Sequence, residues 1–286
     1  LWTVRSVRRL RRYAQQVGEA TAAGAPWRAA PQPPALAGEL GELARAMDQM
    51  RQRLEGREQL EHHVRALTHE LKSPLAAIRG ATELLQEDLA ERDRSRFVMQ
   101  VDEQARRLQN IVERMLELSK LESLQALPAA EPVNLVELTQ QVLAQHKAAL
   151  LQHRLQVCWL GRLETAIAGE RGMLMLALSN VLANAVAHAP AGSMLEIDVV
   201  SAGAGGLQWS LRDHGAGVPD YAMPQLGRRF FSTAGPDGST RGSGLGLAIV
   251  QQVLWLHGGT LRFEAAEPGL RVLLTLPWPA GRSADR

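Results

Sequence analysis

Three polar side chains share one face of an otherwise apolar segment, and their spacing would let them hold a ligand together. Asn180, Asn184 and His188 lie four residues apart in a run dominated by Met, Leu, Ala and Val. At this spacing the side chains of a helix point to the same face. Burying an unpaired amide costs roughly 1–3 kcal/mol, so the face needs a polar partner. Either neighbouring backbone satisfies the two amides, or the face binds a ligand and an amide oxygen coordinates a hard cation such as Mg²⁺.

Two glycine-rich segments further along the chain would let a ligand approach the backbone closely. Asp213-His-Gly215-Ala-Gly217 follows an apolar strand, where the carboxylate can accept a hydrogen bond from an exocyclic amine. Gly242-Ser-Gly244-Leu245-Gly246 precedes a predicted helix, and glycines at a helix N-terminus expose N–H groups to phosphate. The second segment is not a dinucleotide-binding fingerprint, because no strand leads directly into it. It is not a P-loop either, because GK[ST] is missing.

A histidine with an acidic neighbour forms a second candidate site. Glu70 follows His69 and can take the proton of the imidazole ring, which leaves the ring nucleophilic. The apolar seam of this segment passes through Leu67 and Leu71, so we expect His69 on an exposed flank. Pro74 lacks an N–H group, and the carbonyl of Glu70 therefore loses its helical partner one turn beyond the histidine.

Long helices are predicted to position the histidine. Apolar residues at heptad spacing run from Leu36 to Leu54 and again from Leu60 to Leu85, and a third helical run ends near Leu124. A polar turn is predicted over 88–95, between the second and third runs. Two long helices joined by a short turn form an antiparallel hairpin. One hairpin cannot cover both of its apolar stripes, so we expect two copies to form a four-helix bundle.

After Pro128 and Pro132 the pattern changes to strands mixed with helices. Helices are predicted over 133–153, 173–189 and about 245–257. Strands are predicted over 155–160, 165–168, 194–200, 207–212, 261–265 and 270–276. The predicted fold class is therefore multidomain α and α/β, with a dimeric helical hairpin followed by a two-layer α/β sandwich.

Length and composition narrow the classes of protein. A chain of 286 residues corresponds to about two domains. Its apolar fraction of 45% and charged fraction of 22% are those of a globular protein and exclude a disordered or collagen-like chain. The single cysteine, Cys158, cannot form an internal disulfide, which fits a reducing compartment. A net charge of +2 does not indicate nucleic-acid binding.

The N-terminal segment is rich in arginine and starts without a methionine. Five arginines precede the first acidic residue: Arg5, Arg8, Arg9, Arg11 and Arg12. Such a segment is either a solvated helix face or one lying just inside a membrane, where Lys and Arg accumulate. No run of about 18 apolar residues occurs in the sequence. We therefore expect a fragment that begins just after a membrane span.

The order and spacing of the polar motifs resemble the ATP-binding domain of histidine kinases, whose wider superfamily includes gyrase, Hsp90 and MutL. The resemblance covers about 133–277 and includes the Asn pair, the DxGxG segment, Phe230-Phe231 and the GxGxG loop. It implies that Asn184 coordinates Mg²⁺, that Asp213 binds the adenine amino group of ATP, and that 218–241 forms a lid. The nucleotide site that it implies also includes Asn180, His188, Gly215, Gly217, Phe231, Arg241, Gly242, Gly244, Leu245 and Gly246.

The histidine motif and the N-terminal segment resemble other modules of the same kinases. His69-Glu70-Leu-Lys-Ser73-Pro74 resembles their phosphoacceptor motif, and residues 67–80 look most like CreC-type sensor kinases. The resemblance implies that His69 accepts the γ-phosphoryl group with Glu70 as base, and that Ser73 orients a water for phosphatase activity. Residues 38–50 resemble the second helix of a HAMP linker. The predicted domains are a HAMP-like linker at 1–58, a dimerisation and phosphotransfer hairpin at 59–126, and a catalytic ATP-binding domain at 133–280.

Three positions depart from the pattern of the family. Ala187 stands where relatives often have a basic residue near phosphate, and His188 stands where an aromatic side chain often packs on adenine. Phosphate contacts then fall to the lid arginines Arg228, Arg229 and Arg241, or to backbone. Ser73 stands where Thr or Asn is frequent.

The resemblance implies a homodimeric sensor histidine kinase, the cytoplasmic portion of a bacterial inner-membrane protein. It would use ATP and Mg²⁺ and pass the phosphoryl group to an aspartate of a cognate response regulator, without nucleic acid. One alternative is an ATP-gated clamp of the gyrase and Hsp90 class, which lacks the histidine hairpin. The other is a dimeric ATP-binding signalling adaptor without kinase activity, against which the intact Asn184 and Asp213 argue.

Overall fold

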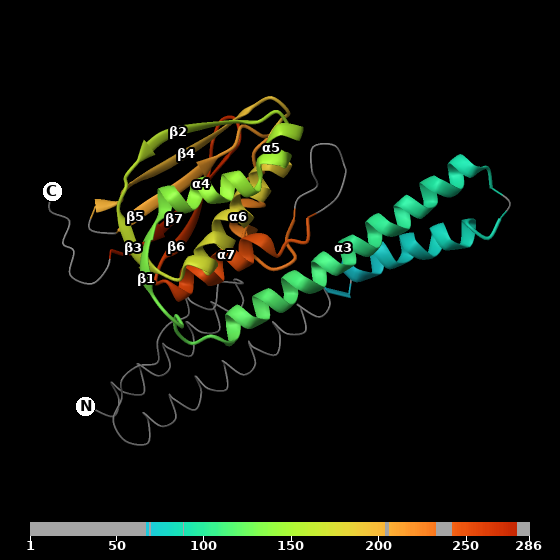
Figure 1. Cartoon of the computed structure of the whole chain (residues 1–286), viewed down its shortest axis with the longest axis horizontal. Helices are drawn as coiled ribbons and strands as arrows, with labels where there is room; N and C mark the ends of the chain where they lie inside the picture. Colours follow the sequence, from blue (N-terminus) through green and yellow to red (C-terminus); the bar gives the residue numbers. More distant parts are fainter. Residues whose placement is uncertain (1–66, 69, 88, 204–205, 233–241, 279–286) are drawn as a thin grey trace, which may run out of the picture. The chain divides into compact units, whose positions relative to one another are not determined.

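The computed structural model describes residues 67–68, 70–87, 89–203, 206–232 and 242–278 (Figure 1). His69, Arg241 and the predicted HAMP-like linker lie outside the described residues. Within the described parts of the chain, no helix combines the length and the apolar character that crossing a membrane requires.

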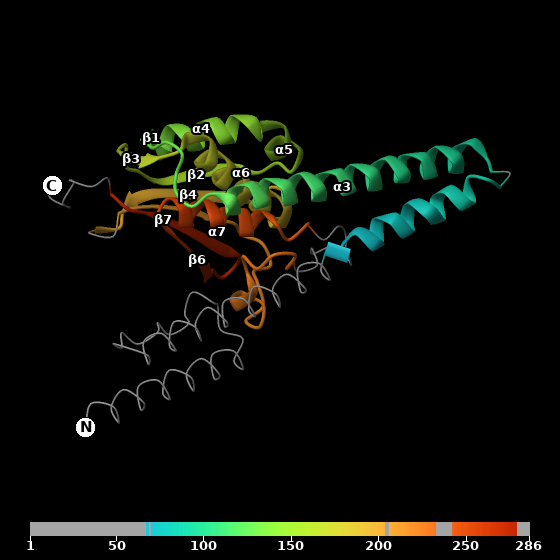
Figure 2. The ribbon, with the colours of Figure 1, turned by 90° about the horizontal axis from the view of Figure 1, so that it is seen from below.

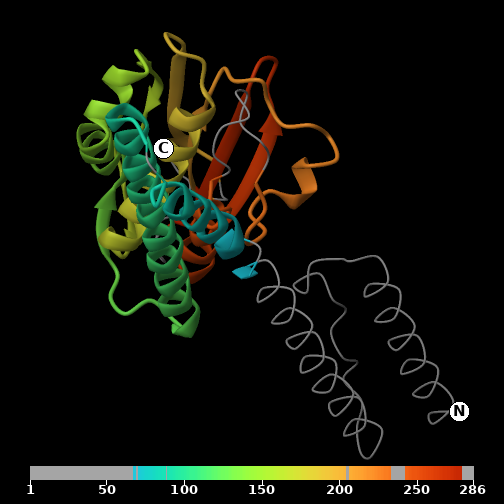
Figure 3. The same cartoon turned by 90° about the vertical axis from the view of Figure 1, so that its right-hand side faces the viewer.

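Two antiparallel helices form the predicted hairpin. The first includes residues 70–84, and the second is α3, Glu91–Ser123 (Figures 1 and 3). The turn was predicted over 88–95, but α3 already begins at Glu91. The N–H groups of Asp93 and Arg94 bond to the carbonyl of Ala90. Acidic residues in the first turn stabilise a helix N-terminus, which is why this polar stretch is helical.

The C-terminal part contains a five-stranded sheet with one parallel pair of strands. The order is β2-β4-β5-β7-β6, in which only β2 and β4 run parallel. The strands are β2 (Gln156–Arg162), β4 (Met194–Ser201), β5 (Leu207–Arg212), β6 (Thr260–Ala265) and β7 (Leu270–Leu276). A separate antiparallel pair consists of β1 (Glu131–Asn134) and β3 (Ala166–Gly169).

Helices cover one face of this sheet and complete the predicted two-layer α/β sandwich (Figures 1 and 2). They are α4 (Leu135–Gln145), α5 (Lys147–Gln152), α6 (Arg171–His188) and α7 (Gly246–Leu256). A short 3-10 helix, η3 (Met223–Gln225), lies between β5 and α7 in the chain. The fold class predicted from the sequence, a helical hairpin followed by an α/β sandwich, is thereby confirmed.

The helix predicted over 133–153 is wrong at its start and in its middle. Residues 131–134 form β1, and α4 begins at Leu135 because the Asn134 side chain accepts hydrogen bonds from the N–H groups of Val136 and Glu137, at 2.9 and 3.4 Å. A break at His146 then separates α4 from α5. Apolar periodicity alone does not reveal such a cap or break.

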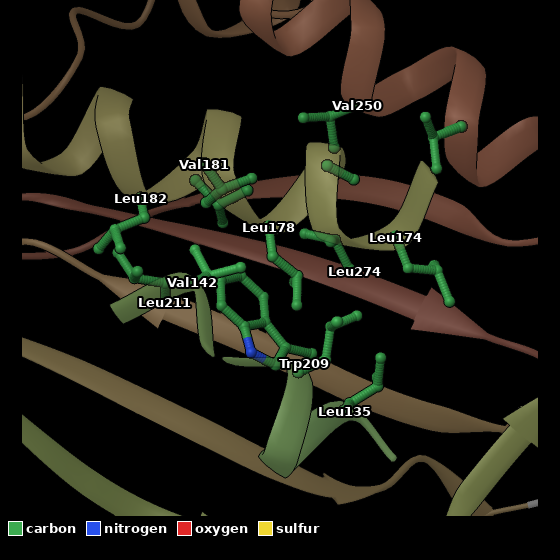
Figure 4. Close-up of a cluster of buried hydrophobic side chains, with 14 of the residues drawn as sticks. Leu135, Val142, Leu174, Leu178, Val181, Leu182, Trp209, Leu211, Val250 and Leu274 are labelled. Carbon is green, nitrogen blue, oxygen red and sulfur yellow. The ribbon is translucent and has the colours of Figure 1, made fainter. Parts of the chain in front are cut away.

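The core lies between the sheet and its helices (Figure 4). Trp209 and Leu211 of β5 and Leu274 of β7 meet Leu178 of α6 and Val142 of α4 there. Burial of large apolar side chains contributes about 1.5–3 kcal/mol each, so this layer provides most of the stability of the domain.

The second helix of the hairpin also belongs to this core. Leu118 and Leu121 of α3 are buried in the same apolar cluster, and α3 packs against α7. The side chain of Gln252 on α7 donates to the carbonyl of Leu121 at 3.3 Å. The C-terminal half of α3 is therefore packed directly against the α/β sandwich.

Candidate functional site

Helix α6 presents the polar face expected from the sequence. The Glu170 side chain caps the helix by accepting from the N–H groups of Gly172 and Met173, at 3.1 and 2.6 Å. Pro190 follows the C-cap Ala189, and the residue before a proline is disfavoured in helical geometry. The face that carries Asn180, Asn184 and His188 is thus fixed at both ends.

The two asparagines of this face have different environments. Asn180 is only 7% exposed, and its Nδ2 donates to the carbonyl of Leu176 at 2.9 Å. Asn184 is half-buried, and its side chain makes no hydrogen bond within the described residues. A backbone carbonyl therefore accepts from the amide nitrogen of Asn180, while the amide of Asn184 is available to a ligand.

Asp213 lies at the end of β5 with one carboxylate oxygen engaged. It is 4% exposed, and its Oδ1 accepts from the N–H groups of Gly215 at 2.8 Å and Leu270 at 3.4 Å. These bonds fix the carboxylate orientation, and its Oδ2 makes no hydrogen bond to the described residues. A Cβ on Gly215 would lie 2.6 Å from the carbonyl oxygen of His188, so only glycine allows this turn to pack on the end of α6. Gly217, in the same turn, has a φ of +75°.

The second glycine segment is held against Phe230 and α6. Gly244 has a φ of +64°, and a Cβ there would lie 2.5 Å from the carbonyl carbon of Phe230. The N–H of Phe230 donates to the carbonyl of Gly244 at 3.0 Å. A Cβ on Gly246 would lie 3.1 Å from Oδ1 of Asn180. The glycine loop, the segment leading to the half-buried Phe231, and the asparagine face therefore meet in one place.

The N-terminus of α7 is open to a ligand. No side chain caps this helix, and the side chain of its N-cap residue, Leu245, is buried. The first N–H groups of a helix have no intrahelical partner and favour anions. Gly242, just before the loop, is exposed.

The residues next to His69 in the sequence belong to the hairpin and not to the α/β sandwich. Glu70 is half-buried, and its carboxylate lies 3.8 Å from the guanidinium of Arg107 on α3. Ser73 is exposed and Pro74 is buried. The acidic neighbour of the histidine is therefore held by a cation from the second helix, a partner that the sequence analysis did not identify.

Two further arginines connect the hairpin to the sandwich. Nη1 of Arg114 on α3 donates to Oδ1 of Asn180 at 2.5 Å. Arg229, one of the proposed lid arginines, forms an ion pair with Glu122 near the end of α3. Burial lowers the pKa of Arg229. Arg107 and Arg114 are seven residues apart and thus share a helix face, but the sequence did not indicate that either contacts a predicted site residue.

A metal ion in this site would be bound mainly by the phosphates of the nucleotide and by few protein atoms. The described residues contain no group of three or more His, Cys, Asp or Glu side chains able to hold a metal ion. Mg²⁺ is usually bound by one or two protein oxygens together with substrate phosphates and water. The free amide oxygen of Asn184 fits that requirement.

The structure combines an α/β sandwich, in which the N-terminus of α7 is open beside an asparagine face, with a helical hairpin. This combination defines a nucleotide-binding type of domain with an attached helical module. Residues 169–280 match the family described as histidine kinase-, DNA gyrase B-, and HSP90-like ATPase. Residues 59–124 match the His Kinase A (phospho-acceptor) domain, and residues 1–56 match the HAMP domain. The chain belongs to the histidine kinases and carries these three domains in the order HAMP, phospho-acceptor domain, ATPase.

The sensor protein CreC of Escherichia coli strain K12 is 34% identical over 272 residues, which is 94% of this chain and 54% of CreC. The resemblance to CreC-type kinases is thereby confirmed. The chain spans about half the length of the curated relatives that it matches. The domain boundaries 1–58, 59–126 and 133–280 stay predictions.

Two solved structures share the fold. Full-length ShkA in complex with AMPPNP has a TM-score of 0.56 at 24% identity, covering 79% of this chain and 47% of ShkA. The Acinetobacter baumannii histidine kinase AdeS has a TM-score of 0.56 at 20% identity, covering 73% of this chain and 97% of AdeS.

Proposed function

We propose that this chain is the catalytic part of a dimeric, membrane-anchored sensor histidine kinase. It binds ATP in the ATPase domain, phosphorylates His69, and passes the phosphoryl group to an aspartate of a response regulator. One observation supports the proposal: the open N-terminus of α7 lies beside Asn180, on the face of α6 that also carries the free amide of Asn184, and the turn that contains Asp213 packs on the end of this helix. Arg114 of α3, in the histidine hairpin, bonds to the same Asn180.

The proposed transfer is a direct in-line displacement. A lone pair of the His69 ring attacks the γ-phosphorus of ATP, the bond from phosphorus to the β–γ bridging oxygen breaks, and ADP leaves with that electron pair. Glu70 takes the ring proton, and Arg107 holds its carboxylate in place. Asn184 would hold Mg²⁺, which neutralises phosphate charge when bound. Asp213 would accept from the adenine amino group through its free oxygen.

Dimerisation is supported by apolar side chains left exposed on the hairpin. Some apolar residues of α3 are buried, but several large ones are exposed. The exposed residues are Val98, Met99, Val112, Met115 and Leu116. Leu75 and Leu84 of the first helix are exposed as well. A second copy of the hairpin would cover these stripes in a four-helix bundle. The HAMP match supports an inner-membrane protein with a cytoplasmic kinase part.

Incubation with γ-labelled ATP and Mg²⁺ tests the proposal. We expect the label on His69 alone, in an acid-labile and alkali-stable form typical of a phosphoramidate. His69→Gln should remove the label and leave ATP binding intact, whereas His62→Gln should retain it. Label that persists in His69→Gln would contradict the assignment. ATP binding without any label in the wild-type chain would instead favour the adaptor without kinase activity.

A further inference from the structure

Arg114 is the one hairpin residue described here whose side chain bonds directly to the asparagine face of α6. Its Nη1 donates to Oδ1 of Asn180 at 2.5 Å, and a Cβ on Gly246 would lie 3.4 Å from the same nitrogen. The guanidinium therefore lies between α6 and the open N-terminus of α7. A guanidinium has five N–H donors. The donors of Arg114 that Asn180 does not use have no partner within the described residues.

The direction of α6 indicates which part of ATP would lie beside Arg114. Asp213, which we assign to adenine, is in the turn that packs against the carbonyl of His188, at the C-terminal end of α6. Asn180 lies eight residues before His188 on that helix, which corresponds to about 12 Å at 1.5 Å per residue. Asn184, the proposed Mg²⁺ ligand, lies midway. A nucleotide with its base at Asp213 would thus extend its terminal phosphate toward Asn180 and Arg114.

Among the described residues, the phosphate end of the site lacks the basic side chain that relatives often have after the second asparagine. Ala187 stands where relatives often have a basic residue. Of the two lid arginines that the structure describes, Arg229 is paired with Glu122, and Arg228 is exposed. Phosphoryl transfer depends on cations that stabilise the charge of the transferring group, and an arginine supplied by another structural element is an effective way to do this.

We propose that Arg114 is a ligand of the terminal phosphate of ATP, supplied by the hairpin in place of the basic residue that is absent at position 187. The inference rests on the proposed kinase function and adds a residue to its site. One donor of Arg114 would stay on Asn180 while others bond phosphate oxygens. Arg107 lies two turns away on the same face of α3, 3.8 Å from the carboxylate of Glu70, the residue that follows His69 in the sequence. The cation is in place only when the hairpin is packed against the ATPase domain.

The test compares nucleotides that differ in the terminal phosphate. In Arg114→Ala, affinity for AMPPNP should fall roughly tenfold, the effect of losing one charged hydrogen bond, while ADP affinity stays unchanged. The autophosphorylation rate should fall by about 100-fold or more. Arg106→Ala is the matched control, because Arg106 is an exposed arginine of the same helix α3 and is paired with Asp102 at 3.0 Å. It should leave both affinities and the rate unchanged.

A second variant separates a phosphate ligand from a residue that only holds the domains together. Adding Ala187→Lys to Arg114→Ala places a cation at the position used by relatives, and it should restore the rate at least tenfold. Equal losses for ADP and AMPPNP, an unchanged rate, a rate above wild type, or no recovery with Lys at 187 would each overturn the inference. Nucleotide affinities do not depend on His69. A wild-type chain that binds AMPPNP through Arg114 but never labels His69 would therefore refute the kinase function without refuting this site.

Discussion

His257 near the end of α7 accepts a hydrogen bond from the backbone N–H of Glu170 through its Nε2, at 3.0 Å. Its Nδ1 lies 2.7 Å from the carbonyl of Val253, which requires the proton on that nitrogen. The ring is therefore neutral in the folded chain and connects α7 to the capped start of α6.

This arrangement predicts a loss of stability in mild acid. Burial lowers the pKa of His257 from its ordinary value of 6.5, against smaller opposing effects of Val253 and Glu170. Above pH 6.5 both states are neutral, and as the pH falls the unfolded chain takes up the proton first. The free energy of unfolding should therefore decrease from about pH 6.5 downward through the folded pKa, with a slope of at most about 1.4 kcal/mol per pH unit.

Denaturation in urea at several pH values measures that slope. His257→Gln, which does not titrate, should lose it, while His153→Gln should retain it, because the ring of His153 makes no hydrogen bond within the described residues. Equal slopes in wild type and His257→Gln would show that another group is responsible.

Trp209 and Thr139 provide a second stability test. The buried indole N–H of Trp209 donates to Oγ1 of Thr139 at 2.9 Å, and that hydroxyl donates to the carbonyl of Leu135 at 2.6 Å. Thr139→Val keeps the shape of the side chain but leaves a buried donor unsatisfied, so it should cost about 1–3 kcal/mol of unfolding free energy. Thr275→Val, at a partly exposed site of β7, should change it by less than about 0.5 kcal/mol. A neutral Thr139→Val would mean that this bond contributes nothing measurable.

Asn184→Ala should weaken nucleotide binding mainly through the metal. The substitution removes the amide oxygen that we assign to Mg²⁺, so most of the Mg²⁺-dependent part of ATP affinity should disappear while affinity in EDTA changes little. Titration calorimetry with and without Mg²⁺ makes the comparison, with the exposed Asn110→Ala on α3 as control. Equal losses in EDTA and Mg²⁺ would indicate a structural asparagine.

Ser73→Ala should spare autophosphorylation but slow the removal of phosphate from the partner regulator. Ser73 is exposed one turn after His69, where its hydroxyl could hold a water beside a phosphoaspartate. The rates of His69 labelling and of regulator dephosphorylation are measured separately, and Ser73→Thr should preserve both. Unchanged dephosphorylation in Ser73→Ala would leave Ser73 as a helix-surface residue.

Local signals determined most of the fold, and distant contacts account for what the sequence did not reveal. Strands were predicted over 207–212 and 270–276, and β5 and β7 have these bounds. Strand β1 was missed because it has only four residues and contains Pro132. The asparagine face and the glycine loop were predicted because each lies within one short segment. Arg114 was not, because its contact with Asn180 joins residues 66 apart and depends on how two elements pack.

The burial of Leu118 and Leu121 in the core of the sandwich has a consequence for how the molecule opens. One continuous helix belongs to the hairpin at its start and to the ATPase domain at its end, so its two halves should not unfold together. Backbone amides around 115–123 should exchange with deuterium as slowly as those of α7, and only on global unfolding of the sandwich. Amides around 92–105 should exchange at the faster rate of the hairpin. Cooperative unfolding would then divide α3 within its length, and a fragment cut at 133 would lack part of its own core.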